Sequence, residues 1–123
     1  MSTGLFDRNP KLQMILGHLG ECIPFNIWRI DNIVQKAPRG YPGKRTMGEY
    51  FRENVYVTTS GNFRTPSLLS TMLEISSDRI LYAVDYPFES FEEGAHWFDH
   101  CEISEHDRKK IGRENARQLF NLP

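Results

Sequence analysis

Residues 11–21 read KLQMILGHLGE, and this stretch decides the fold class. Its centre, residues 14–16, is a continuous apolar run closed by Gly17, which predicts a buried strand over residues 11–17. The next segment changes period, because apolar residues recur at helical spacing along one stripe: Ile23, Ile27, Ile30 and Val34. A buried strand followed at once by an amphipathic helix is typical of an α/β fold.

The rest of the chain repeats this alternation. Residues 55–59 are β-branched and aromatic and predict a second strand, and residues 80–84 predict a third that ends at Asp85. Between these strands, Thr65 is predicted as the N-cap of a helix with Pro66 at its first position. Other segments complete the prediction: a Pro/Gly loop over 37–45, a short helix near 47–51, and helices near 90–101, 104–111 and 113–120, the last two separated by Gly112.

This order of elements indicates right-handed βαβ units and a parallel sheet. Three strands cannot close a barrel, and a three-stranded parallel sheet leaves two unpaired edges. We therefore expect the sheet to belong to a larger structure.

Composition excludes several classes of protein. The chain has 123 residues, 39% of them hydrophobic and 25% charged, with a formal net charge of −1, which fits one domain with a core and no nucleic-acid surface. No apolar run approaches the roughly 20 residues that span a bilayer. Residues 1–4 lack signal-peptide features, and Cys22 and Cys101 form no disulfide framework. We expect a cytoplasmic protein without nucleic-acid or membrane partners.

Candidate catalytic residues follow the predicted strands. His18 and Glu21 follow the first strand and Asp85 follows the third, so a parallel sheet would bring them to one rim. A histidine with a carboxylate partner can move a proton near neutral pH, and an aspartate can bind a divalent cation or act as an acid. The alternatives are a core histidine at 18, a helix first-turn carboxylate at 21 and a helix cap at 85.

Two further patterns are interpreted without a catalytic role. His96 and His100 have the spacing of a metal pair, but the glutamate of an H-E-x-x-H motif is absent. We expect both on the solvent face of their helix, opposite Phe91, Ala95 and Phe98. Cys22 is predicted to be a small apolar filler.

An ordered series of motifs resembles a known family. Five segments carry the resemblance: ILGHLGE at 15–21, WRID at 28–31, YVTTSGNF at 56–63, DRIL at 78–81 and DYPFE at 85–89. They resemble the amidohydrolase-related superfamily, and within it the γ-resorcylate and 2,3-dihydroxybenzoate decarboxylases. The resemblance implies a metal-dependent (β/α)₈ TIM barrel that decarboxylates hydroxybenzoate-type acids without oxidation. It also implies one divalent metal (Zn, Mn or Mg), no organic cofactor, a small aromatic carboxylic acid as substrate, and a homo-oligomer in the full-length family.

The resemblance also implies roles for individual residues. Asp85 matches a metal-ligating aspartate that is also the proton donor to the ring carbon. His18 matches a catalytic histidine, and Glu21 matches its carboxylate partner. Substrate-binding roles fall on one cation and two pocket-wall residues: Arg29, Pro87 and Phe88.

The sequence departs from the family pattern at three places. The family's E-x-H motif on strand one and its metal-binding histidine on strand five have no counterpart. Residues 32–35 (NIVQ) replace a His-Arg-Asn-like stretch, and Cys22 stands where glycine is usual. We therefore expect residues 1–123 to form one partial domain, about strands six to eight plus the terminal helices, that is inactive alone. The alternatives are a hydrolase of the same superfamily and a non-catalytic or degenerate module that pairs with a full-length homologue.

Overall fold

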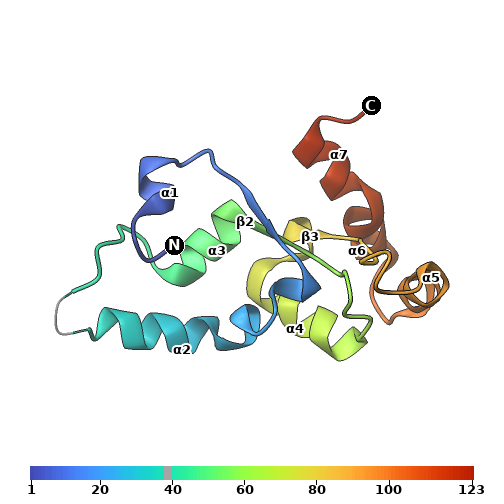
Figure 1. Ribbon diagram of the computed structural model, residues 1–123, viewed down its shortest axis with the longest axis horizontal. Helices are drawn as coiled ribbons and strands as arrows, with labels where there is room; N and C mark the ends of the chain where they lie inside the picture. Colours follow the sequence, from blue (N-terminus) through green and yellow to red (C-terminus); the bar gives the residue numbers. More distant parts are fainter. Residues whose placement is uncertain (38–39) are drawn as a thin grey trace.

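The computed structural model describes residues 1–37 and 40–123, and it contains the predicted parallel sheet (Figure 1). Strands β1 (Met14–Leu16), β2 (Val55–Thr58) and β3 (Ile80–Leu81) lie in the order β1-β2-β3, and both neighbouring pairs are parallel. Pro38 and Arg39 of the predicted Pro/Gly loop lie outside the described residues. The α/β alternation expected from periodicity is confirmed.

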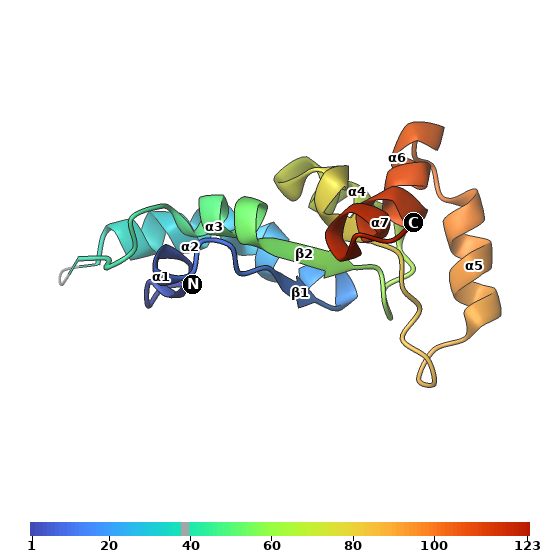
Figure 2. The same ribbon diagram turned by 90° about the horizontal axis from the view of Figure 1, so that it is seen from above.

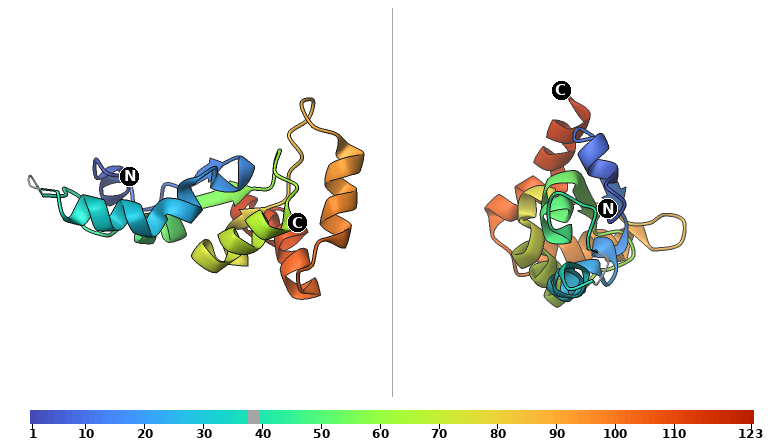
Figure 3. Two further views of the ribbon diagram at one scale, coloured as in Figure 1. Left: turned by 90° about the horizontal axis from the view of Figure 1, so that it is seen from below. Right: turned by 90° about the vertical axis from the view of Figure 1, so that its left-hand side faces the viewer.

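Helices separate the strands and follow the last one. The described helices are α1 (Leu5–Arg8), α2 (Ile23–Gln35), α3 (Met47–Asn54), α4 (Thr65–Ile75), α5 (Phe91–His100), α6 (Glu105–Lys109) and α7 (Asn115–Phe120), with short turns η1 (His18–Gly20), η2 (Ser77–Arg79) and η3 (Lys110–Glu114). The molecule is elongated, with α1 and α2 at one end and α5 and α6 at the other (Figure 2 and Figure 3).

Much of the core lies between the sheet and the helices α2, α3 and α4, which contact one another, and it extends to Phe6 of α1, Phe98 of α5 and Ile111 of η3. Val55 and Val57 of β2 are buried, whereas Tyr56 and Thr58 on the opposite face of this central strand are only partly covered. The alternation arises because successive side chains of a strand point to opposite faces. One face of the sheet is therefore packed, and the other is partly open.

The prediction of a buried first strand is wrong for this chain. Met14 and Ile15 of β1 are 37% and 43% exposed, because β1 pairs with β2 on one side and has no strand among the described residues on the other. A continuous apolar run predicts burial on both faces, but burial requires neighbours on both sides. The exposed run shows that β1 has the composition of an interior strand at an edge position.

The later boundaries also differ from expectation. Gly112 does not separate two helices, because residues 110–114 form a π-helical turn that joins α6 to α7. A Cβ at Gly112 would lie 3.1 Å from the Phe98 ring, so close packing explains this glycine.

The N-cap of α4 is Arg64 and not Thr65. The Thr65 hydroxyl instead accepts a 3.2 Å hydrogen bond from the Trp97 indole. Ser104 caps α6, because its hydroxyl accepts a 3.1 Å hydrogen bond from the Asp107 amide.

Among the described residues, no helix has both the length and the apolar character needed to cross a membrane.

The open edge predicts self-association of the 123-residue chain. Unpaired strand edges with apolar side chains pair readily with other chains, so sedimentation should show concentration-dependent oligomers or a marginally stable monomer. Ile15→Lys should shift the population toward monomer because charge on an edge opposes pairing. The control is Leu73→Lys on α4, which is 89% exposed and lies outside the sheet. A monomeric chain that unfolds cooperatively at all concentrations would contradict this prediction.

Candidate active site at the carboxyl ends of the strands

Three titratable side chains meet at the carboxyl ends of the strands. His18 follows β1, and its Nδ1 lies 2.7 Å from Glu21 Oε1. Its Nε2 lies 3.2 Å from Asp85 Oδ2, although the two residues are 67 positions apart in sequence. The predicted convergence on one rim is confirmed, and the rim below means the side chains of His18, Glu21 and Asp85. The imidazole of His18 links the two carboxylates.

The backbone around this rim is unusual. His18, Leu19 and Glu21 have φ of 51°, 55° and 56°, and Asp85 has φ of 86°. Left-handed conformations cost L-residues about 1–2 kcal/mol each, and such strain gathers at functional sites. The turn folds back so sharply that Glu21 reaches the His18 ring three residues earlier.

Gly61 makes the approach of His18 to Asp85 possible. This residue follows β2 with φ of +64°, and an added Cβ would lie 2.9 Å from His18 Cδ2 and 3.4 Å from Asp85 Oδ2. Any side chain at this position would push the imidazole away from the aspartate. Gly61 follows the predicted second strand, but the sequence does not single it out, because its importance depends on a contact between distant segments.

Thr59 fixes the segment that carries Asp85. The buried Thr59 hydroxyl accepts a hydrogen bond from Ala83 N (3.0 Å) and donates one to Ala83 O (2.8 Å). The Gly61 amide donates to the Val84 carbonyl at 3.2 Å. These bonds continue the β2–β3 ladder beyond Leu81, where β3 ends earlier than predicted, and hold the backbone leading to Asp85.

Ser60 connects β2 to the His18 turn. Its hydroxyl accepts a 3.4 Å hydrogen bond from the His18 amide and lies 2.6 Å from the Thr58 hydroxyl. The Thr59–Gly61 segment therefore contacts both the turn that carries His18 and the segment that carries Asp85, and it aligns the two.

The carboxylates favour the protonated imidazole. The hydrogen bond to Glu21 raises the pKa of His18 above its ordinary value, and the bond to Asp85 adds to this effect. Because the folded-state pKa is raised, the stabilisation is fully present below about pH 6.5 and is lost as pH rises through the folded pKa. The side chain is 44% exposed, so solvent screening keeps this stabilisation small.

The other predicted site residues lie on exposed segments. Pro87 and Phe88 belong to the projecting loop between β3 and α5, after a cis Tyr86–Pro87 peptide bond (Figure 2), and Phe88 is 84% exposed. Phe88 N donates to Asp85 O at 2.9 Å, which ties the loop to the rim aspartate through the backbone. Apart from the Asp85 carboxylate, no side chain of this loop hydrogen-bonds to His18 within the described ranges.

Arg29 lies on the exposed side of α2 and lines a hollow of about 510 Å³ that Glu21 also lines. Cys22 is exposed in the same hollow, so the prediction of a buried filler is wrong.

Asp31, two residues after Arg29 on α2, accepts hydrogen bonds from Met47 N and Gly48 N at the start of α3, at 2.5 and 3.0 Å. Asp31 therefore joins two helices.

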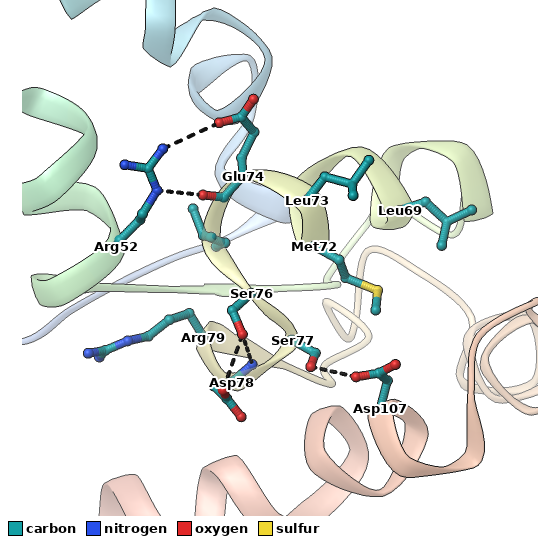
Figure 4. A pocket seen from close by; sticks show the side chains of 11 residues that line it. Arg52, Leu69, Met72, Leu73, Glu74, Ser76, Ser77, Asp78, Arg79 and Asp107 are labelled. Carbon is teal, nitrogen blue, oxygen red and sulfur yellow. Dashed lines mark hydrogen bonds and ion pairs between the residues drawn. The ribbon is translucent and has the colours of Figure 1, made fainter.

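A larger hollow, about 1040 Å³, lies at the opposite ends of the strands (Figure 4). Residues 74–79 of its wall precede β3, whereas the rim residues follow the strands. Its polar groups have partners: Arg52 donates to the Glu74 carbonyl at 2.8 Å, and Ser77 donates to Asp107 at 2.6 Å. This hollow separates α4 from α6 and contains no group of the rim.

Metal ligands are incomplete at the rim. Within residues 1–37 and 40–123, no three His, Cys, Asp or Glu side chains come close enough together to hold a metal ion. Asp85 and His18 bring only two side chains together, and Glu21 is on the far side of the imidazole. These residues do not make a complete metal site by themselves.

Comparison with known proteins identifies the family. The amidohydrolase family model matches residues 2–122. The chain belongs to the amidohydrolase family. It is 52% identical to the γ-resorcylate decarboxylase of Rhizobium sp. (strain MTP-10005), with 99% of this chain covered and 38% of the relative. This amidohydrolase chain therefore spans well under half the length of that relative.

Solved structures agree with this assignment. The 2,6-dihydroxybenzoate decarboxylase in complex with 2,6-dihydroxybenzoate has a TM-score of 0.93 at 52% identity, covering 99% of this chain and 38% of its own. The dihydroxybenzoic acid decarboxylase from Polaromonas sp. JS666, with bound manganese and the inhibitor 2-nitroresorcinol, has a TM-score of 0.92 at 53% identity, covering 98% and 37%. The resemblance stated from the five motifs is confirmed.

The first prediction for this site concerns the titration of His18. In the metal-free chain, NMR titration should give His18 a pKa above the ordinary value of about 6.5. Glu21→Gln should lower this pKa more than Asp85→Asn, because the Glu21 hydrogen bond is the larger cause of the shift. Glu102→Gln, at an exposed position after α5, serves as the control. An ordinary pKa that no variant changes would contradict the observed geometry.

A second prediction concerns Gly61. Gly61→Ala should displace the imidazole, lower the His18 pKa and destabilise the fold by roughly 1–3 kcal/mol, measured by NMR and thermal unfolding. The matched control is Gly40→Ala, which has a similar φ of +75° but nothing within 4 Å of the added Cβ. If both variants leave His18 unchanged, close approach at Gly61 is unimportant.

Proposed function

We propose that this chain is part of a metal-dependent decarboxylase acting on hydroxybenzoate-type acids. Residues 1–123 would form a single partial domain, supplying about strands six to eight and the terminal helices of a (β/α)₈ barrel. The parallel order β1-β2-β3 and the exposed apolar residues of β1 support this placement. Such barrels need about 250 residues, and complete ones in this family would assemble as homo-oligomers.

The observation that carries the proposal is the His18 imidazole held between Glu21 and Asp85 at 2.7 and 3.2 Å. Glu21 orients the ring and favours its protonated form. Asp85 faces the other ring nitrogen, so a proton can pass between His18 and Asp85 without movement of the backbone. We assign Asp85 the role of proton donor to the substrate, and His18 the role of supplying that proton.

The proton has a defined use in this reaction. Asp85 would protonate the ring carbon that carries the carboxylate, which makes that carbon tetrahedral. The bond to the carboxylate then breaks, its electron pair restores the aromatic ring, and CO₂ leaves. One proton is consumed and one CO₂ is released, so no oxidant or organic cofactor is needed.

Asp85 would also contribute one carboxylate ligand to a divalent cation. Manganese is bound in the Polaromonas relative and in a 5-carboxyvanillate decarboxylase of Novosphingobium aromaticivorans. When bound, such a cation would offset the negative charge of the substrate. Its remaining ligands would come from outside the described residues, because these do not hold a complete site.

Substrate contacts would come from the exposed segments beside the rim. Arg29 is a cation suited to a carboxylate or phenolate, and Pro87 and Phe88 offer apolar surface for an aromatic ring. Aromatic surface that stays exposed to water is unfavourable in free energy, so exposed aromatic side chains beside a site often mark where a ligand or another protein binds. The exposure of Phe88 thus supports an aromatic pocket whose other walls lie outside this chain.

The chain alone is expected to be inactive, and a second candidate function follows from its open edge. The exposed residues Met14 and Ile15 of β1 favour pairing with a full-length homologue or complementary polypeptide. In that case the chain would serve as a non-catalytic or modulating partner.

A chimera tests the catalytic proposal. Residues 1–123 would replace the matched segment of the Rhizobium γ-resorcylate decarboxylase, to which they are 52% identical. With Mn²⁺, the chimera should release CO₂ from 2,6-dihydroxybenzoate, while the 123-residue chain should not. Asp85→Asn and His18→Asn should each lower kcat by about a hundredfold or more, the usual contribution of general acid–base catalysis.

Asp99→Asn, an exposed carboxylate on α5, is the matched control and should leave kcat unchanged. A folded chimera without turnover would favour the non-catalytic partner. Full turnover in the Asp85→Asn variant would remove Asp85 from the site.

A further inference from the structure

We propose that His96 and His100 on α5 form a binding site for a divalent transition metal, separate from the rim. The two residues are one helical turn apart, and their ring centroids lie 4.3 Å from each other with an interplanar angle of 37°. Both side chains are exposed, as predicted, although Phe91 and Ala95 are exposed as well and only Phe98 of the expected apolar face is buried. Two histidines at this spacing on one helical face can bind a single metal ion.

The tautomer of His100 leaves a nitrogen free for a metal. Nδ1 of His100 lies 2.7 Å from the backbone oxygen of His96. A carbonyl oxygen can only accept, so Nδ1 must donate its hydrogen, and in the neutral ring Nε2 keeps its lone pair. Metal-binding histidines typically use this arrangement, in which a hydrogen bond at one nitrogen orients the other toward the metal.

The charge of this region favours a cation. From Arg79 to Arg108 the chain has no intervening Lys or Arg. The same stretch carries eight acidic residues: Asp85, Glu89, Glu92, Glu93, Asp99, Glu102, Glu105 and Asp107. Arg108 contacts the end of α5 through the Phe98 and Cys101 carbonyls, but its charge is paired with Glu105 at 3.0 Å.

Imidazole ligands determine which ions would bind. Nitrogen donors suit Cu²⁺, Ni²⁺ and Zn²⁺, with Cu²⁺ the strongest, whereas Mg²⁺ prefers oxygen ligands. Two protein ligands leave the remaining coordination positions to water. The site would therefore bind these metals even in a chain whose rim lacks a full ligand set, and metal content alone would not report on the rim.

The test uses Ni²⁺ and the four histidines of the 123-residue chain. Calorimetry should show one Ni²⁺ bound and no Mg²⁺ binding. His96→Gln and His100→Gln should each weaken Ni²⁺ binding by at least about tenfold, since even indirect metal partners contribute 10–100-fold. His18→Asn at the rim and exposed His106→Gln are the controls and should bind Ni²⁺ like the unmodified chain. Circular dichroism checks that each variant is folded.

A second measurement locates the ion. Substoichiometric Cu²⁺ should first broaden the NMR signals of the His96 and His100 rings. Ni²⁺ binding that survives both α5 variants, or that is lost only in His18→Asn, would overturn the proposal. Equal binding of Mg²⁺ would also overturn it, because the acidic residues would then be the ligands. None of these results depends on decarboxylase activity, so they do not bear on the proposed function.

Discussion

The parallel pairing of β1, β2 and β3 is the constraint on which the rest of the structure depends. Because the strands run in one direction, the residues that follow them meet at one edge of the sheet. His18, Gly61 and Asp85 each follow a different strand, and they come into contact for this reason. The Thr59 hydroxyl then extends the pairing beyond β3 and fixes the path to Asp85.

The rim is complete as a hydrogen-bonded unit but incomplete as a metal site. His18 has a carboxylate at each ring nitrogen, so a proton can be held and moved by residues of this chain. No third ligand joins Asp85 and His18 within the described part of the chain. The fold is likewise complete in one part and open in another. One face of β2 is buried, while β1 presents an open edge. Both features support the proposal that these residues form the proton-handling side of a site whose other half would lie on another polypeptide segment.

Sequence periodicity predicted the order of strands and helices and the positions of His18, Glu21 and Asp85, because these depend on local pattern and on the direction of the strands. It could not predict the exposure of Ile15, which depends on which strands are neighbours. It also misread Gly112 as a helix break, since the need for glycine there comes from the Phe98 ring, fourteen positions earlier in sequence. Gly61 and Thr59 were missed for the same reason: their contacts with His18 and Ala83 are long-range.

The most direct test of this account is the proton distance between His18 and Gly61. An added Cβ at Gly61 would lie 2.9 Å from His18 Cδ2, so one Gly61 Hα must lie close to the His18 Hδ2 proton. A NOESY spectrum of the metal-free 123-residue chain should show a strong cross-peak between these two protons. Absence of this cross-peak in a folded chain would contradict the claim that the parallel strands of this chain bring these residues into contact.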